Sequence, residues 1–391
     1  MAVHFIYMKR VLVTGANGFV GRHLVQHLFD QPYHKTNGHK LERYQIFATD
    51  LSPRPIDSVA RLISMKRGVS YLPSDLRNPE SLKPLFEEDE LSKPIDTVYH
   101  PAALFNLCMN LDQLKEVNVE GTVNLISEAQ QSGVRRVINW SSSSIYGCWE
   151  EDEKRNEEYP LKLEEMLNAY AKSKFLQEQA AQEFDNPDRI RVTSVRPANI
   201  YGIGTNMGIA FPLLAIHKKM MKRPAARLDE KGEPIYAAGS HVHVKDVIKA
   251  AYFLANDKRA AGEIYNLAED KPISTVELFE LGCYLIGRKM KEDYNTPKSL
   301  ERGAKIFSAL AGLRNGLVYA LTFGQRKTKW YPLFDKESSQ FMVNNHLIDN
   351  QKITDLGFKF EHNIKDSLRE IVYHHKKTGW KEIKYFKREY V

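Results

Sequence analysis

The chain has 391 residues, of which 42% are hydrophobic and 27% are charged, so it is too hydrophobic for a disordered protein and long enough for two domains or lobes. Its formal net charge is +7, and residues 288–330 hold ten basic and three acidic residues, so this stretch alone carries the whole excess. We interpret the stretch as a basic solvated face and expect no nucleic-acid partner, because no groove-reading motif accompanies it.

The N-terminal half alternates short β-rich runs with helical patterns, which indicates an α/β fold whose parallel sheet is covered by helices on both faces. The predicted strands are Arg10–Thr14, Ile46–Thr49, Val69–Leu72, Thr97–His100, Val137–Trp140 and Val192–Val195. The predicted helices are Phe19–Phe29, Asn110–Ser132 and Glu164–Phe184. We interpret residues 1–7 as an extension and Asp30–Gln45 as a surface loop. The charged stretch Glu150–Glu165 is either a lid or a solvated loop.

The first strand runs into a GxxGxxG turn formed by Gly15, Gly18 and Gly21, and a helix follows. Such glycines let the backbone approach a pyrophosphate that lies on the helix N-terminus. Asp50 ends the second strand, where its carboxylate is placed to accept both hydroxyls of an adenosine ribose. That charge would repel a 2′-phosphate, so NAD is favoured over NADP, and Arg54 keeps NADP as the minority alternative.

Two later strand ends add cofactor contacts. Asp75 follows the third strand and is placed to receive the adenine amino group, and Ala102 and Ala103 lie after the fourth strand. The complete predicted cofactor-binding set is Gly15, Asn17, Gly18, Phe19, Val20, Gly21, Asp50, Asp75, Leu76, Pro101, Ala102, Ala103, Tyr170, Lys174, Pro197 and Asn199.

Tyr170 and Lys174 lie four residues apart in a predicted helix and therefore share a face. The ammonium of a neighbouring lysine stabilises a phenolate and lowers a tyrosine pKa that is ordinarily about 10. The four serines 141–144 follow the fifth strand, at the sheet edge where α/β proteins bind ligands. A hydroxyl there can hold the reacting oxygen of a substrate beside Tyr170.

Together these features resemble the extended short-chain dehydrogenase/reductase superfamily, the NAD-dependent epimerases and dehydratases, over at least residues 9–270. The segments Val117–Ala129 and Val195–Gly202 add to the resemblance. It implies catalytic roles for Ser142, Tyr170 and Lys174, with Asn118 as a structural and proton-relay residue and no metal. Counting back from Tyr146-Gly147 selects Ser142, and Ser143 is the fallback.

The resemblance also implies a Rossmann-type doubly wound parallel sheet with a smaller, mostly α C-terminal lobe that determines the substrate. We expect residues 1–199 plus 236–290 to form the NAD-binding domain and residues 200–235 plus 291–391 to form the substrate-binding lobe. Homodimers through the two long predicted helices are common in relatives, so we expect a homodimer.

The substrate is less clear from the sequence. Nucleotide-sugar enzymes of this type carry an arginine just before the "VHVxDV" segment, where this chain has Ala238-Gly239-Ser240-His241. Within 299–323 an apolar stripe recurs at helical spacing between basic residues, and a core face is the commoner explanation by about two to one. The alternatives are a helix on a membrane surface or a wall for an apolar substrate. The stripe consists of Ile306, Leu310, Leu313, Leu317 and Leu321.

The stretch 299–323 and the segment Asn344–Phe360 loosely resemble the 3β-hydroxysteroid dehydrogenase branch. We therefore expect an NAD-dependent oxidoreductase that acts on a secondary alcohol or ketone of a small-molecule, sterol- or lipid-like substrate. One alternative is a nucleotide-sugar epimerase or dehydratase with tightly held NAD, and another is a non-catalytic NAD-sensing protein. The nucleotide-sugar alternative would gain support if Lys218, Lys219, Arg223 or Arg227 lined the pocket and bound a diphosphate.

The cysteines indicate the compartment, and the histidines are the candidates for a metal site. Cys108, Cys148 and Cys283 form no CxxC pair or disulfide framework, which fits a reducing, cytoplasmic location, with peripheral membrane contact through 299–323 as an extension of that expectation. The closest candidates for a metal-ligand cluster are His374-His375 and the pair His241 and His243, for which we favour surface or packing roles.

Overall fold

The computed structural model describes residues 8–31, 34–36, 40–87, 94–105, 109–219, 223–224, 226–290, 297–321, 328–332, 339–383 and 386–390. Residues 1–7, Cys108, Thr322 and Phe323 lie outside the described residues, as do the side chains of Leu317 and Leu321.

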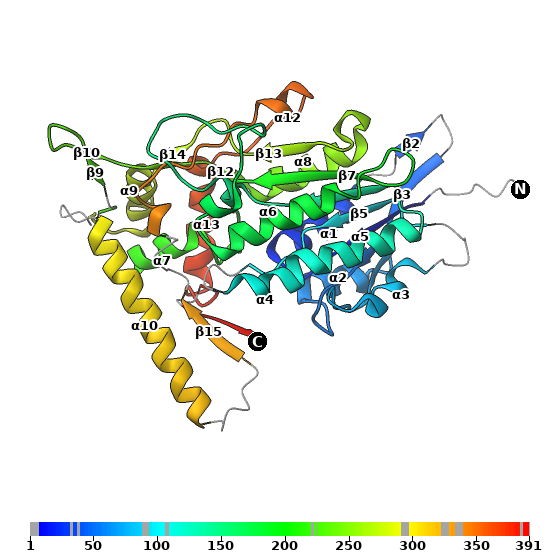
Figure 1. Ribbon diagram of the computed structural model, residues 1–391, viewed down its shortest axis with the longest axis horizontal. Helices are drawn as coiled ribbons and strands as arrows, with labels where there is room; N and C mark the ends of the chain where they lie inside the picture. The colour runs from blue at the N-terminus through cyan, green and yellow to red at the C-terminus, as the bar shows by residue number, and fades with distance from the viewer. Residues whose placement is uncertain are drawn as a thin grey trace, which may run out of the picture.

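A twisted sheet of parallel strands forms the centre of the molecule (Figure 1), in the order β4, β3, β1, β5, β6, β7, β13, with β2 added antiparallel to β3. Its strands are β1 (Met8–Val13), β2 (His34–Thr36), β3 (Lys40–Ala48), β4 (Val69–Tyr71), β5 (Thr97–His100), β6 (Arg136–Trp140), β7 (Arg191–Pro197) and β13 (Ile264–Leu267). Strand β1 pairs with β3 on one side and with β5 on the other, so the strand order reverses there. The crevice beyond the carboxyl ends of β1 and β5 is therefore where this class of sheet binds ligands.

Helices bury both faces of the sheet, and the predicted Rossmann-type α/β fold is confirmed. Helices α1 (Phe19–Asp30), α2 (Asp57–Ser64) and α8 (Val244–Asn256) contribute to the core on one face. Helices α3 (Lys83–Phe86), α5 (Gly121–Gln131) and α6 (Ala169–Gln182) contribute to the core on the other.

The structure differs from the sequence prediction at three places. The helix predicted over 110–132 is divided into α4 (Leu111–Lys115), a π-helical turn η2 (Glu116–Glu120) and α5. Helix α6 starts at Ala169 rather than at 164, because the Oδ1 atom of Asn168 accepts a hydrogen bond from the Ala171 N–H at 2.8 Å and caps the helix. The predicted surface loop 30–45 contains β2 and the start of β3, which form an antiparallel pair.

A second hydrophobic cluster lies outside the sheet core and unites distant segments. It includes residues of α7 (Ala210–His217), α9 (Thr275–Ile286) and α13 (Ile364–Lys377). The sheet core in turn includes Leu347, Ile348 and Ile353 from the C-terminal segment. The predicted division into a cofactor domain and a substrate lobe stays a prediction.

Short paired strands and two more helices complete the described elements. The pairs are β8 (Asn199–Tyr201) with β12 (His241–His243), β9 (Arg227–Leu228) with β10 (Pro234–Ile235), β11 (Ala238–Gly239) with β14 (Ile273–Ser274), and β15 (Thr328–Pro332) with β16 (Phe386–Tyr390). The helices are α10 (Pro297–Leu321) and α12 (Gln351–Asp355).

Helix α10 projects from the body of the molecule (Figure 1). The core-face interpretation of its apolar stripe was wrong for Ile306, Leu310 and Leu313, which are exposed because the opposite side of the helix contacts the protein. None of the helices in the described ranges combines the length and the apolarity that crossing a membrane requires.

Candidate active site

The glycine turn at the end of β1 is packed so closely that side chains would not fit. Gly15 has φ of +60°, and a Cβ atom there would lie 2.8 Å from the Cα of Ala102. A Cβ atom on Gly21 would lie 2.1 Å from the carbonyl oxygen of Gly15. Gly18, the N-cap of α1, supplies no side-chain hydrogen bond, and the first turn of the helix holds no acidic residue. The positive end of α1 is thus left to an external anion, which fits the diphosphate of a dinucleotide.

Asp50 lies beside this turn, held by two backbone donors. Its carboxylate accepts hydrogen bonds from the N–H of Asn17 at 3.1 Å and from the N–H of Ser52 at 3.3 Å. The Asn17 side chain in turn accepts from the N–H of Ile56 at 2.9 Å and donates to the carbonyl of Arg54 at 3.1 Å. The predicted ribose acceptor is therefore fixed next to the predicted diphosphate site, whereas the Arg54 side chain is exposed.

Asp75 and Leu76 lie after β4, with different surroundings. Asp75 forms an ion pair with Arg77 at 2.7 Å, and the hydrogen bonds from Arg77 lower the pKa of that carboxyl group. Leu76 is buried against α5, where a Cβ atom on Gly121 would lie 2.8 Å from the Cβ of Leu76. The adenine contact of Asp75 stays a prediction, since that carboxylate already has a cationic partner.

The other predicted cofactor residues differ in burial and contacts. The N–H of Ala102 donates to the hydroxyl of Thr14 at 3.3 Å, which ties the segment after β5 to the end of β1. The ring of Phe19 lies on the first turn of α1, 3.5 Å from where a Cβ atom of Gly202 would be. Of the rest, Val20, Pro101 and Ala103 are half-buried, Pro197 is buried and Asn199 is exposed.

Tyr170 and Ser142 meet at the carboxyl end of β6. Tyr170 is buried in the first turn of α6, and Ser142 lies close enough to its hydroxyl to act on its pKa. Burial raises the pKa of Tyr170, and the Ser142 hydrogen bond opposes that rise in part. Phe105 packs edge-on to the Tyr170 ring at 4.6 Å between centroids, and Met109 belongs to the same apolar cluster. The two hydroxyls therefore lie side by side next to hydrocarbon.

The four serines after β6 differ in their hydrogen bonds. Ser142 caps the short helix that follows, accepting from the N–H of Ser144 at 3.2 Å. Ser143 is buried, and its hydroxyl lies 2.8 Å from the Nε2 atom of His346. The N–H of Ser141 bonds the carbonyl of Val195 at 2.8 Å in the sheet. Of the two candidates, Ser142 is the one that meets Tyr170, whereas the fallback Ser143 is bonded to a histidine.

Lys174 lies one turn after Tyr170 in α6 and is only 1% exposed. Its ammonium donates to the carbonyl of Trp140 and, at 2.6 Å, to the side-chain oxygen of Gln177. Burial lowers the pKa of Lys174 to about 7, with the Glu178 carboxylate acting in the opposite direction. The lysine therefore lies below the serine turn and is bonded to the last residue of β6.

Asn118 occupies the π-helical turn η2 and is buried. Its side chain accepts from the N–H of Leu104 at 2.7 Å and donates to the Leu104 carbonyl at 3.1 Å. It also donates to the hydroxyl of Ser173 on α6 at 3.0 Å. Asn118 thus joins the segment that follows β5 to the helix that carries Tyr170 and Lys174. Such π turns often occur at functional sites.

Residues of the C-terminal segment contact the serine turn, and the sequence did not predict these contacts. His346 lies between Ser143 and the carbonyl of Gly147, which is 2.7 Å from its Nδ1 atom. Asn345 exchanges backbone hydrogen bonds with Trp149 at 3.0 and 2.7 Å. Because these partners are about two hundred residues apart, no spacing in the sequence could have paired them. The charged loop 150–165 is also fixed here, since the Arg155 N–H donates to the carbonyl of Leu347 at 2.9 Å.

A buried ion pair supports the serine turn from behind. Arg196 on β7 and Glu178 on α6 are both buried and share two hydrogen bonds of 2.6 and 2.8 Å. Arg196 also donates to the hydroxyl of Tyr146 at 2.6 Å. Each buried charge is therefore neutralised by a bidentate partner.

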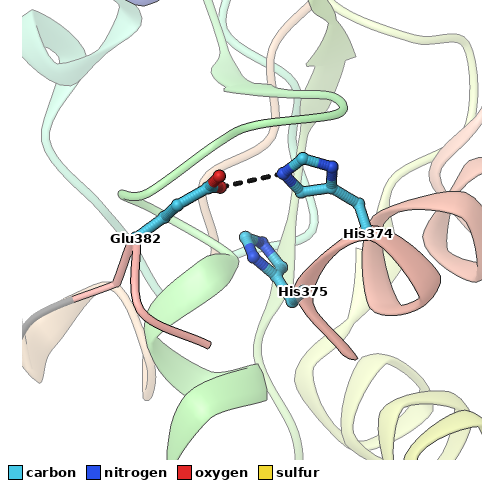
Figure 2. Close-up of side chains that lie close together, drawn as sticks. All are labelled: His374, His375 and Glu382. Carbon is cyan, nitrogen blue, oxygen red and sulfur yellow. Dashed lines mark hydrogen bonds and ion pairs between the residues drawn. The ribbon is translucent and has the colours of Figure 1, made fainter. Parts of the chain in front are cut away.

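A separate cluster brings His374, His375 and Glu382 together (Figure 2), with candidate ligand atoms within 4.8 Å of one another. The two histidines are adjacent in the sequence, whereas Glu382 reaches them only because the chain turns back after α13 ends. His374 lies 2.8 Å from the Glu382 carboxylate, and the ring of buried His375 stacks on Trp380. The segment also carries Lys376, Lys377 and Lys381. These charges disfavour a further cation, so we retain the surface and packing interpretation.

Comparisons with known proteins agree with this geometry. A family model described as the NAD dependent epimerase/dehydratase family matches residues 11–268, more than half of the chain. The chain is 27% identical over 295 residues to a 3-beta-hydroxysteroid dehydrogenase of Mycolicibacterium neoaurum, with 72% of each chain covered. It is 28% identical over 281 residues to dTDP-D-glucose 4,6-dehydratase of Mus musculus, covering 70% of this chain and 71% of that protein. The structure of UDP-glucose 4-epimerase from Thermus thermophilus in complex with NAD aligns with a TM-score of 0.63 at 21% identity, covering 94% of this chain and 99% of the epimerase.

Proposed function

This chain belongs to the NAD-dependent epimerase/dehydratase family, and from that premise we propose that it is a dehydrogenase/reductase acting on a secondary alcohol or ketone with an apolar, lipid-like body. The observation that carries the proposal is that the hydroxyls of Ser142 and Tyr170 are neighbours beside the apolar side chains of Phe105 and Met109. A substrate oxygen bound there would lie beside Ser142 as hydrogen-bond donor and Tyr170 as proton-transfer group. The carbon skeleton next to that oxygen would contact Phe105 and Met109.

In the proposed reaction, NAD supplies the hydride acceptor or donor. The hydroxyl of Tyr170 exchanges a proton with the substrate oxygen, and Ser142 donates a hydrogen bond to that oxygen. Burial raises the pKa of Tyr170, so its hydroxyl is protonated in the unliganded site and needs nearby positive charge before it can act as a base. We assign that charge to Lys174, with Asn118 holding the backbone that faces the site.

The nucleotide-sugar alternative finds less support in the cations that it would need. Arg227 is paired with Glu150 at 2.8 Å, and Arg223 lies 3.7 Å from Glu280. Gly239 stands near the place where nucleotide-sugar enzymes of this type carry a phosphate-binding arginine. A diphosphate would therefore have to compete with carboxylates for two of the four candidate cations. The other two, Lys218 and Lys219, are exposed at the end of α7.

The test starts from protein purified without added cofactor and then denatured, so that any released nucleotide can be identified. Protein that emerges empty but binds NAD reversibly, and then produces NADH from a sterol or another apolar secondary alcohol, supports the proposal. NAD retained at about one per chain, with nucleotide sugars converted without net NADH, would replace it by the epimerase/dehydratase alternative. The predicted homodimer is checked by light scattering on the same preparation before it is denatured.

A further inference from the structure

Helix α10 faces the protein with one side and solvent with another. Leu300, Ala304 and Ala311 are buried, and the first two belong to a cluster with Val343 on the body of the protein. At about 100° per residue, these three positions share one side of the helix. Leu300, Ala304 and Ala311 are thus the described buried side chains of α10, and they mark the side that faces the protein.

The opposite side of α10 presents a stripe of large apolar side chains to solvent. Ile306, Leu310 and Leu313 are 60%, 51% and 65% exposed, and helical geometry places them within an arc of about 60° opposite the buried side. Three such side chains on one helix face form a contiguous patch, and patches of this kind mark binding surfaces.

Basic side chains border the stripe along both edges. By the same geometry, Lys298, Arg302 and Lys305 lie along one edge and Arg314 lies along the other. The only acidic residue of the helix, Glu301, lies farther round and is paired with Lys305 at 3.1 Å. Helix α10 thus combines an apolar stripe with four basic residues and one acidic residue.

We propose that α10 docks on an anionic phospholipid surface, with Ile306, Leu310 and Leu313 inserted among the acyl chains and the basic residues at the headgroups. Long basic side chains can reach the headgroups while their stems stay in contact with hydrocarbon, and each contributes about 1 kcal/mol near an anionic surface. A second copy of the chain would bring the same cations against one another, so charge complementarity favours lipid over self-association.

The docked helix would lie close to the candidate active site. Leu300 and Ala304 pack against Val343 and Met342, and Phe341 just before them contacts the ring of His346 at 5.4 Å between centroids. His346 in turn is bonded to Ser143. The inference does not depend on the substrate, because the stripe and its charges are independent of the chemistry at Tyr170.

The test is co-sedimentation of the full chain with phosphatidylcholine vesicles that contain or lack phosphatidylserine. We expect the chain to pellet with the anionic vesicles at low salt, to bind neutral vesicles weakly and to be released by high salt. The triple variant I306S/L310S/L313S should lose at least about tenfold in partitioning, because its apolar contact is removed. Each of Lys298→Gln and Arg302→Gln should lose about fivefold, and only on anionic vesicles.

The matched control is Leu228→Ser, which removes an exposed leucine from β9 and should bind as the wild type does. All variants are checked for unchanged NAD binding and thermal unfolding, since the altered side chains are exposed. The inference is overturned if the wild type stays in the supernatant with anionic vesicles at low salt, or if the triple variant binds as well as the wild type. It is also overturned if the wild type is a dimer that the triple variant dissociates, because the stripe would then be a self-association surface.

Discussion

Replacing Lys174 by methionine should separate the effect of the buried charge on the free energy of unfolding from its role in catalysis. In the folded chain the ammonium is buried and its pKa falls from 10.5 to about 7, so the unfolded chain holds one more proton between those values. Stability must therefore rise with pH across that window, because folding there no longer requires burial of a charge. At about 1.4 kcal/mol per pH unit, the full effect is about 5 kcal/mol as an order of magnitude.

Lys174→Met removes this pH dependence and also removes the donor to the Trp140 carbonyl and to Gln177, at about 1–3 kcal/mol for each lost partner. Near about pH 6 the two effects offset each other, so the variant should be about as stable as the wild type. Near about pH 10 only the lost hydrogen bonds remain, and the variant should be less stable by a further margin of about 4 kcal/mol. Dehydrogenase activity should be lost at every pH.

The assay is urea unfolding of both proteins without NAD at several pH values, comparing the free energies of unfolding as a difference. Titrations of groups that do not interact with Lys174 cancel in that difference. Lys172→Met, on the same helix but half-buried, serves as the control and should give a flat difference. A flat difference for Lys174→Met, within about 1 kcal/mol across the range, would refute the reasoning that Lys174 is buried at the cost of stability.

Three further predictions follow from single contacts. Tyr170→Phe should lower kcat by about 10²–10⁴-fold and retain NAD binding in calorimetry. The control Tyr284→Phe, at a position 76% exposed, should change neither quantity. A wild type without turnover, whose response to NAD is unchanged in Tyr170→Phe, would instead favour the NAD-sensing alternative. Gly15→Ala should weaken NAD binding at least about tenfold, because its backbone has φ of +60° and a Cβ atom would meet Ala102, whereas Gly312→Ala, with nothing within 4 Å, should leave binding unchanged; equal affinities would show that the turn tolerates a side chain. Glu178→Gln should lower the free energy of unfolding by about 3–5 kcal/mol by leaving Arg196 uncompensated, whereas Glu165→Gln, which breaks a surface pair with Lys162, should cost less than about 1 kcal/mol; similar losses in the two would contradict the buried-pair argument.

The features that the sequence predicted well depend on neighbours along the chain. The turn from Gly15 to Gly21 and the spacing of Tyr170 and Lys174 are local patterns, and the strands before them belong to one parallel sheet, whose strands end at the same edge. The start of α6 was missed although its signal is also local, since Asn168 is a good capping residue that the longer helical periodicity obscured.

The features that were missed depend on contacts that no periodicity contains. The pairing of Asn345 and His346 with the serine turn joins segments far apart in the sequence. The exposure of the stripe on α10 was missed for a similar reason. Spacing tells which apolar residues share a side of the helix, but not whether another element covers that side. The π turn around Asn118 was not foreseen because one extra residue within a helical turn leaves the composition unchanged.

The pairing between residues 345–348 and the serine turn also bears on how the protein matures. A ribosome releases the strands and helices of the dinucleotide crevice first, and N-terminal portions of a chain generally fold as they emerge. His346 and Asn345 are synthesised about two hundred residues after Ser143 and Trp149. A nascent or truncated chain that ends before these residues would lack their contacts with the serine turn. We expect the formation of this late contact to be a slow step in gaining activity.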